Sequence, residues 1–173
     1  MSSTISGGKI TFSYTKNEIF NKCCLLSAYM TKNLKDGDQS AMDDYSMTDD
    51  EENMFLACLE SSMPDTWEAV LKITSGVQDA YYIEDTTAPA EGDNPATTAG
   101  DVTIKIQDNG AYNGNAVTLV DASFKNCIIY GVLRDYYATN VHNVLLKLAA
   151  ERYAAELAKL GTRLFQLKKK SLV

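Results

Sequence analysis

The acids of one loop are the residues best suited to chemistry, because carboxylate oxygens are preferred ligands of calcium. A calcium-binding loop of the EF-hand type would take four side chains from it: Asp36, Asp38, Ser40 and Asp44. Such a loop also needs glycine at its sixth position and a bidentate glutamate at its twelfth, where this sequence has Ala41 and Met47. We therefore predict no metal site and interpret the segment as an acidic, solvated loop.

The single histidine and the cysteines lack the neighbours that nucleophilic catalysis requires. On an unbroken helix His142 would lie about four turns from Cys127, too far for a hydrogen bond, so we expect it at a helix surface or an interface. The four cysteines are Cys23, Cys24, Cys58 and Cys127. They form no Cys-x-x-Cys pair for zinc and each lies among apolar residues, which predicts buried thiols in a reducing compartment.

Motifs for phosphate binding, dinucleotide binding and acyl transfer are absent from the sequence. The glycine pair before Lys9 lacks the rest of a phosphate-binding loop, and adjacent acids such as Asp43 and Asp44 point apart. We therefore expect no catalytic residue and no cofactor, and hence no enzyme. A site assembled from His142 and Asp135 is the enzymatic alternative, which a pocket joining them would favour.

The first half of the chain is predicted to be helical after a short arm. Residues 1–14 alternate in the manner of a strand, although Gly7-Gly8 loosens its start. Thr15–Glu18 and Thr48–Glu51 each have the spacing of a capping box, so each should begin a helix. Pro64 is expected to begin a third helix, because proline is favoured in a first helical turn.

The middle of the chain changes to a β pattern. Tyr81–Glu84 and Val102–Gln107 have strand character and are predicted to pair as an antiparallel hairpin. The polar segment between them, residues 86–100, has no apolar residue larger than alanine and is expected to form a tip that is mobile or ordered by a partner. Ala116–Val120 fits either a third short strand or the start of a helix.

The last third of the chain is predicted to hold two long helices. One begins near Ala122 and breaks near Thr139-Asn140. The other has a continuous apolar seam: Leu146, Ala149, Tyr153, Leu157, Leu160, Leu164 and Leu167. A helix of about 25 residues spans roughly 38 Å, so we expect part of it to pack on another subunit.

These elements predict one mainly α domain, a helical bundle with a long C-terminal helix and a small mid-chain antiparallel β-hairpin. Its parts within residues 1–173 are an N-terminal arm (1–14), helices (15–76), a β insertion (77–120), long helices (121–170) and a tail (171–173). No apolar run approaches the ~18 residues of a membrane span, and the first residues lack a secretory pattern. We expect the chain to fold in a cytoplasm without a membrane.

Charge is distributed unevenly along the chain. The net charge is −7, yet residues 36–101 hold 17 acids and one base, while residues 122–173 hold nine bases and three acids. Such segments can pack on each other within a chain, join identical subunits head to tail in a ring, or remain solvated faces. Because the domain is acidic and lacks a helix-turn-helix pattern, we expect no sequence-specific nucleic-acid binding and at most non-specific proximity to DNA.

The bundle, the mid-chain β element and the long C-terminal helix with its basic end resemble the head–tail connector (adaptor) proteins of tailed bacteriophages. The resemblance is architectural, covers roughly Thr15 to Lys170 and includes no diagnostic motif. It implies a non-enzymatic structural protein of the virion, assembled in the host cytoplasm as a homo-oligomeric ring that contacts portal and tail proteins.

The same resemblance implies where the contacts between subunits and partners lie. The β element and the basic C-terminal segment supply these residues: Tyr81, Tyr82, Ile83, Lys159, Arg163, Lys168, Lys169 and Lys170. The alternative is a small intracellular helical module that binds or regulates other proteins as a monomer or dimer. Its size in solution would separate it from a ring.

Overall fold

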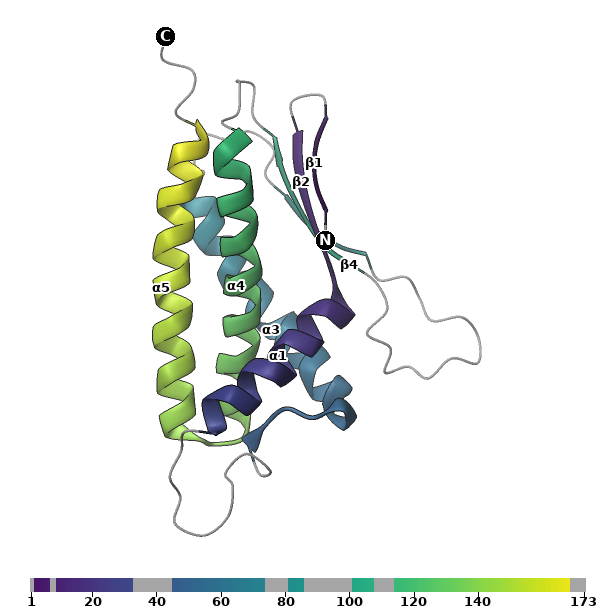
Figure 1. Cartoon of the computed structure of the whole chain (residues 1–173), viewed down its shortest axis with the longest axis vertical. Helices are drawn as coiled ribbons and strands as arrows, with labels where there is room; N and C mark the ends of the chain where they lie inside the picture. Colours follow the sequence, from purple (N-terminus) through teal and green to yellow (C-terminus); the bar gives the residue numbers. More distant parts are fainter. Residues whose placement is uncertain are drawn as a thin grey trace, which may run out of the picture.

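The computed structural model describes residues 2–6, 9–32, 45–73, 81–85, 101–107 and 114–168. The strands are β1 (Ser2–Ser6), β2 (Lys9–Thr15), β3 (Tyr81–Asp85) and β4 (Asp101–Gln107). The helices are α1 (Lys16–Thr31), the 3-10 turn η1 (Asp49–Glu51), α3 (Glu52–Ile73), α4 (Gly114–Thr139) and α5 (Asn143–Lys168). In Figure 1, α4 stands between α5 and the strands, α1 crosses in front of it, and α3 lies behind. The mainly α bundle with a long C-terminal helix is confirmed.

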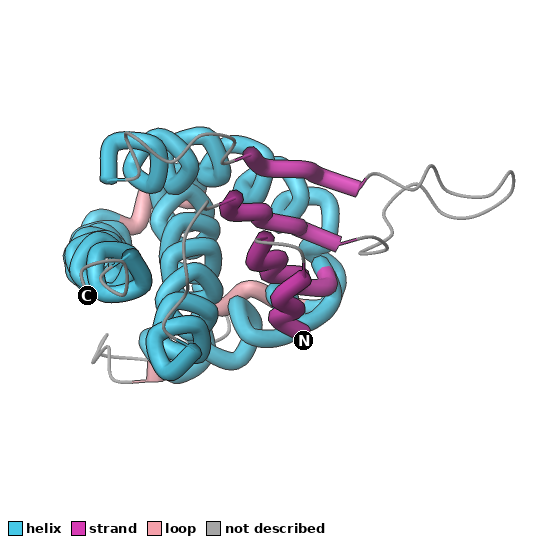
Figure 2. Tube along the Cα trace, turned by 90° about the horizontal axis from the view of Figure 1, so that it is seen from above, coloured by secondary structure: helices cyan, strands magenta, loops and turns pink. Residues whose placement is uncertain are grey.

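The four strands form one antiparallel sheet in the order β1-β2-β4-β3, on one flank of the helices (Figure 2). Every second residue of the two central strands has a buried side chain, and we call these positions, with the positions of β1 and β3 in register with them, the core row. In the central strands the core row consists of Ile10, Phe12 and Tyr14 in β2, and Val102, Ile104 and Ile106 in β4. The register sets these residues opposite each other, as in Phe12 and Ile104. The intervening positions, the outer row, include the half-buried Thr11 and Thr103. One face of the sheet therefore belongs to the core.

The N-terminal arm is part of this sheet, which the sequence reading did not anticipate. The predicted mid-chain hairpin is confirmed as β3 and β4, and β2 pairs with β4 along its whole length from Lys9 to Thr15. Gly7-Gly8 separates β1 from β2, and a glycine pair between two alternating runs is a recognised hairpin signal. The arm and the insertion thus unite segments about 90 residues apart.

The central helix α4 is buried around most of its circumference, because it is apolar on nearly every side. Although Asp121 and Lys125 interrupt its apolar run, it is the one described helix whose length and composition would allow a membrane span. Within the protein, 61% of its most apolar window is buried, as the central helix of a core requires. Gly131 allows close packing here, since a Cβ would lie 3.1 Å from the Ser62 Cβ on α3.

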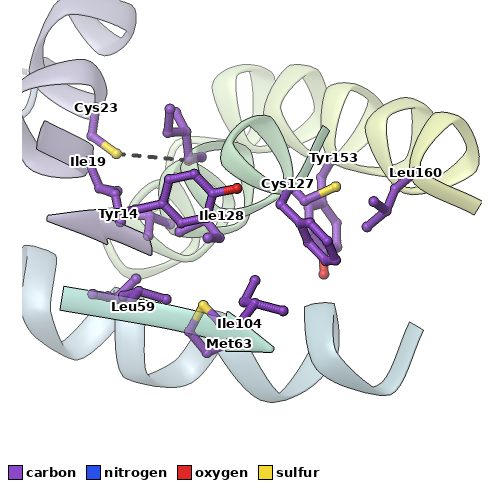
Figure 3. Packing of buried hydrophobic residues seen from close by; sticks show 14 of the residues in the cluster. Tyr14, Ile19, Cys23, Leu59, Met63, Ile104, Cys127, Ile128, Tyr153 and Leu160 are labelled. Carbon is purple, nitrogen blue, oxygen red and sulfur yellow. Dashed lines mark hydrogen bonds between the residues drawn. The ribbon is translucent and has the colours of Figure 1, made fainter. Parts of the chain in front are cut away.

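Each layer of the fold contributes side chains to one hydrophobic core, as Figure 3 shows. The labelled residues are Tyr14 and Ile104 from the sheet, Ile19 and Cys23 from α1, Leu59 and Met63 from α3, Cys127 and Ile128 from α4, and Tyr153 and Leu160 from α5. All four cysteines are free thiols; Cys23, Cys58 and Cys127 are buried as predicted, whereas Cys24 is only partly buried. The core is therefore shared by sheet and helices, and the two cannot be separated without exposing it.

The apolar seam of α5 packs on α4 with two adjustments to the predicted positions, at Leu146 and at Leu157, which is also only partly buried. The seam begins at Leu145, which is fully buried, and Leu146 is only partly buried. Ala149, Tyr153, Leu160, Leu164 and Leu167 are buried as the spacing required. Glu156 occupies the same face and is 8% exposed, so a carboxylate lies inside a helix–helix contact. The expectation that part of α5 packs on another subunit stays a prediction.

The helix ends follow the local signals. The Thr15 side chain accepts a hydrogen bond from the Glu18 backbone N–H at 3.1 Å, which caps α1. The Glu51 carboxylate accepts from the Thr48 N–H at 2.8 Å and from the Tyr136 hydroxyl at 3.1 Å. The capping residue thereby also ties η1 to α4.

The predicted break between the last two helices is a Schellman turn. The His142 N–H donates to the Tyr137 carbonyl at 3.0 Å, and the Val141 N–H donates to the Ala138 carbonyl at 3.3 Å. Val141 has a φ of 56°, in the left-handed region where such turns usually have glycine. It is also 79% exposed.

Two predicted boundaries were wrong. Pro64 does not begin a helix, because α3 runs through it. The proline is on the exposed side, while Met63 and Thr66 on the buried side hold both halves of α3 to the core. The β insertion does not extend to residue 120, because Ala116–Val120 lies in α4, the helical one of its two predicted alternatives, with Ala116, Val117 and Val120 buried at helical spacing.

Candidate interaction surface

The residues predicted for contacts lie on two separate elements. Tyr81, Tyr82 and Ile83 are in β3, the last strand of the sheet order. Lys159 and Arg163 lie along the second half of α5, and Lys168 is its last residue. Lys169 and Lys170 are outside the described residues. The structure thus places the prediction at a sheet edge and at a helix terminus, and it does not join them into one cluster.

The sheet offers two edges to a partner. Each of β1 and β3 pairs with a neighbouring strand on one side, and on the other side neither has a partner strand among the described residues. An edge strand presents a row of backbone donors and acceptors that another strand can pair with. The contact residues predicted from the sequence lie in one edge strand, β3, and β1 was not predicted as an edge, although Gly7-Gly8 between two alternating runs was an available signal.

Arg163 serves the fold of its own chain. Its guanidinium donates to the Leu119 carbonyl at 3.0 Å and to the Ser123 hydroxyl, both on α4. Since Ser123 is fully buried, the arginine supplies a partner for a hydroxyl that has lost contact with water. Arg163 therefore fixes the C-terminal half of α5 against the start of α4. Its predicted contact with another subunit would have to use the remaining donors.

Lys159 neutralises the carboxylate inside the α4–α5 contact. Its Nζ donates to Glu156 Oε1 at 2.6 Å, and Asn126 Nδ2 on α4 donates to Glu156 Oε2 at 3.4 Å. The lysine side chain itself is 55% exposed, so its charge still reaches solvent. Burial, with a smaller effect of Glu156, raises the pKa of the Cys127 thiol to about 12. This cluster is polar packing without a reactive nucleophile.

His142 caps α5. Its Nδ1 accepts a hydrogen bond from the Leu145 backbone N–H at 3.2 Å, which requires that nitrogen to be unprotonated. The imidazole packs edge to face with the Tyr45 ring at a centroid distance of 4.3 Å, and the centroid of the Tyr137 ring lies 6.4 Å away. The histidine therefore holds the loop before η1 against the turn between α4 and α5. This is a structural role inside the subunit.

Arg134 centres a polar network that the sequence reading missed. Its Nε donates to Asp135 Oδ1 at 2.7 Å, and its Nη2 donates to Asp65 Oδ2 on α3 at 2.9 Å. The guanidinium also lies 4.8 Å from the ring centroid of Tyr153 on α5, a cation–π distance. The Tyr153 hydroxyl completes the link to α3 through Thr66 at 3.0 Å. No local motif marks these residues, because the network exists only where three helices meet.

Asp135, the other residue of the enzymatic alternative, is held by this network. One of its oxygens faces Arg134, and Oδ2 is buried without a hydrogen-bond partner among the described residues. The described ranges contain no cluster of three metal-ligating side chains. Residues 36–44 of the predicted acidic loop lie outside the described residues.

A shallow depression of about 380 Å³ follows the outer face of α1. The residues that line it are Thr15, Asn17, Glu18, Asn21, Lys22 and Leu25. Leu25 is 62% exposed, and Tyr29 one turn later is 67% exposed. These side chains diverge on a convex helix and do not converge on one point, so they build no site for a small molecule.

The chain was compared with protein-family models, curated proteins and solved structures, and nothing matched in any of the three comparisons. The residues and their geometry are therefore the basis for assigning a function.

Proposed function

We propose that this protein is a non-enzymatic structural component of a tailed-phage virion, a ring-forming head–tail connector between portal and tail. The observation that carries the proposal is the sheet with two edges. β1 and β3 are on opposite sides of it, and each lacks an outer partner strand among the described residues. A subunit with two different edges can join its neighbours head to tail, which is the contact that generates a ring.

Further support comes from the use that the fold makes of its polar side chains. His142 caps a helix, Arg134 and Arg163 join helices, and Glu156 is paired inside a helix contact. Groups engaged in this way hold a rigid body together and are not poised for proton or group transfer. A rigid body with pairing edges suits a protein that transmits position from one assembly layer to the next.

The basic end of α5 is assigned to the contact with a neighbouring subunit or with portal and tail proteins. The acids of residues 36–101 outnumber the bases 17 to one, so a neighbouring copy offers a surface of opposite charge. Exposed charges are screened by salt at roughly 8 Å at physiological ionic strength. We therefore expect this part of the contact to weaken as salt is raised.

The proposal is tested by the mass and shape of the particles in solution. Light scattering after size exclusion, with electron microscopy, should detect rings of the purified chain that bind the portal protein of the same phage. Replacing Lys168, Lys169 and Lys170 with glutamine, or deleting residues 86–100, should reduce ring formation while leaving the thermal unfolding of the subunit unchanged.

Lys147→Gln with Arg152→Gln is the matched control, because both side chains are exposed on the same helix. This pair should assemble like the parent. A small species at every concentration, with no portal binding, would exclude the connector and favour the small helical binding module instead.

A further inference from the structure

The two edges of the sheet match each other in length and chemistry. β1 and β3 each have five residues. Neither contains proline, lysine or arginine, which proteins commonly place on edge strands to prevent pairing. β1 is uncharged, and the acids of β3 are confined to its end at Glu84 and Asp85. Pairing β1 with β3 would therefore oppose no like charges.

The strand directions also match. All three strand pairs are antiparallel, so the direction alternates along the order β1-β2-β4-β3, and β1 and β3 run in opposite directions. If a second copy is placed beside the first in the same orientation, its β1 runs opposite to β3 of the first. The junction is then a fifth antiparallel pair that continues the pattern.

The backbone donors and acceptors match for the same reason. Along an antiparallel strand, the N–H and C=O groups of successive residues point alternately to one side and to the other. The register is continuous across four strands, so whichever row points outward at β1 also points outward at β3. Setting the two edges together with their rows aligned brings outward-pointing groups opposite each other, and every outward group gains a partner.

We propose that β1 of each subunit pairs with β3 of the next, so that one antiparallel sheet runs continuously from subunit to subunit. This inference rests on the proposed ring, for which it supplies the contact. Full overlap of the two strands sets Thr4 opposite Ile83 of the partner subunit. It also sets Ile5 opposite Tyr82 of the partner subunit. Ile5 and Tyr82 are both in the core row, because Ile5 is in register with Ile10 and Tyr82 with Ile104.

Alignment of the rows restricts this register. A shift by one residue would set core-row positions of one subunit against outer-row positions of the next, so the alternation of the two rows would not continue across the junction. The pairing is heterologous, because each bound subunit still offers one β1 and one β3. It therefore propagates until the ring closes.

The test is disulfide trapping between two co-expressed variants, Thr4→Cys and Ile83→Cys. Opposed residues of an antiparallel pair have Cα atoms about 4.5–5.5 Å apart, which is within the range of a disulfide. Both positions are in the outer row, through their register with Thr11 and Thr103. Mild oxidation of the mixture should yield covalent dimers that neither variant gives alone.

The native cysteines do not interfere with this test at neutral pH. Burial raises the pKa of the Cys24 and Cys58 thiols to about 11 and that of Cys127 to about 12, and it also raises the pKa of Cys23 well above its ordinary value. The thiolate is the reactive form in disulfide exchange. The introduced thiols on the sheet edges should therefore react first.

Two controls define the register and the surface. In one mixture Tyr82→Cys replaces Ile83→Cys. This mixture should give no covalent dimer, because Tyr82 is in the core row and Thr4 is in the outer row. Ala138→Cys, exposed at the far end of α4, replaces it in another mixture and should also give no dimer.

The particle mass of each sample is measured alongside trapping, so that the two proposals fail separately. Rings without trapping in the Thr4→Cys and Ile83→Cys mixture would overturn the edge pairing and leave the connector proposal intact. Covalent dimers of Thr4→Cys alone would report β1–β1 pairing, and those of Ile83→Cys alone would report β3–β3 pairing. Either result would also overturn the proposed pairing of β1 with β3. Trapped filaments that never close would support the edge pairing and contradict the ring, and a monomer at all concentrations would contradict both.

Discussion

Between the helices, polar side chains find partners within the chain, whereas the two outer edges of the sheet have none among the described strands. Of the buried side-chain atoms in the described residues, only Asp135 Oδ2 and the Tyr137 hydroxyl lack a hydrogen bond. By contrast, β1 and β3 each have a side on which no described strand pairs with them. Because unpaired backbone groups are satisfied by water or by another strand, the difference locates the capacity for association in the sheet.

The two regions are nevertheless one mechanical unit. The Tyr14 hydroxyl on β2 donates to the Asp121 carboxylate on α4 at 2.7 Å and to its backbone carbonyl at 3.1 Å. Lys125 on α4 pairs with Glu18 at the start of α1, directly after β2. Force applied at a sheet edge would therefore pass to the central helix.

The largest predicted effect tests whether sheet and helices unfold as one. Burial raises the pKa most at three tyrosines, Tyr14 in the sheet and Tyr136 and Tyr137 in α4, with the Asp121 hydrogen bond adding to the effect at Tyr14, and it raises the pKa of Tyr153 less. In the unfolded chain they ionise near pH 10, so above that pH the unfolded state holds fewer protons. The free energy of unfolding should then fall by about 1.4 kcal/mol per pH unit for each, or about 4 kcal/mol for all three.

Urea unfolding between pH 8 and 11.5, with absorbance of ionised tyrosine, measures this loss. Below about pH 10 the loss should come from the four thiols, whose pKa values burial also raises and which ionise at about pH 8.5 in the unfolded chain, and the tyrosines should steepen the slope above pH 10. Tyr137→Phe should reduce the tyrosine slope by about a third, since it removes one such phenol. If Tyr14 ionised in a separate step before the α4 tyrosines, sheet and helices would unfold as independent units. That result would contradict the conclusion that they form one mechanical unit.

The sequence predicts the helical part of this molecule better than the sheet, for a physical reason. Capping at Thr15 and the α5 seam are local periodic signals within one element, and both are seen. Pairing of β2 with β4 joins residues 90 positions apart, and no local pattern specifies that partner. The Arg134 network was missed for the same reason, because its partners come from three helices.

Pro64 illustrates the opposite error, in which a local signal was followed and tertiary packing overrode it. The missing hydrogen bond at a proline inside a helix costs about 3 kcal/mol. Buried side chains on both sides of Pro64 in α3 offset that cost. The contact residues Tyr81, Tyr82 and Ile83 were placed correctly in a strand, and their role in contacts stays a prediction.

A smaller effect is predicted for Arg134→Met, which tests the claim that helical polar groups serve the fold. Methionine keeps the apolar stem but leaves the largely buried Asp135 carboxylate without its cation, which should cost about 2–3 kcal/mol in the free energy of unfolding. Urea titration measures the change, and the fraction of folded protein that assembles should be unaltered. Arg152→Met, exposed on α5, is the control and should change stability by less than about 0.5 kcal/mol. Loss of assembly in folded Arg134→Met would contradict the separation of roles.

The smallest effect is expected at the turn between α4 and α5. There the backbone N–H groups of Val141 and His142 donate hydrogen bonds to carbonyls of α4. Val141 is β-branched and has a φ of 56°, a conformation that costs an L-residue roughly 1–2 kcal/mol. Glycine adopts it freely but loses more backbone entropy on folding, so Val141→Gly should raise the free energy of unfolding by about 0.5–1 kcal/mol. The matched change Val144→Gly, three residues later in α5, should lower it by about 0.5 kcal/mol, because glycine is the poorer helix former.

Opposite signs of the two changes in the free energy of urea unfolding would establish that the turn stores strain. If Val141→Gly instead destabilised the chain, the 79% exposed valine would be contributing contacts, and this end of the helices would have to be counted with the sheet edges as an associating surface.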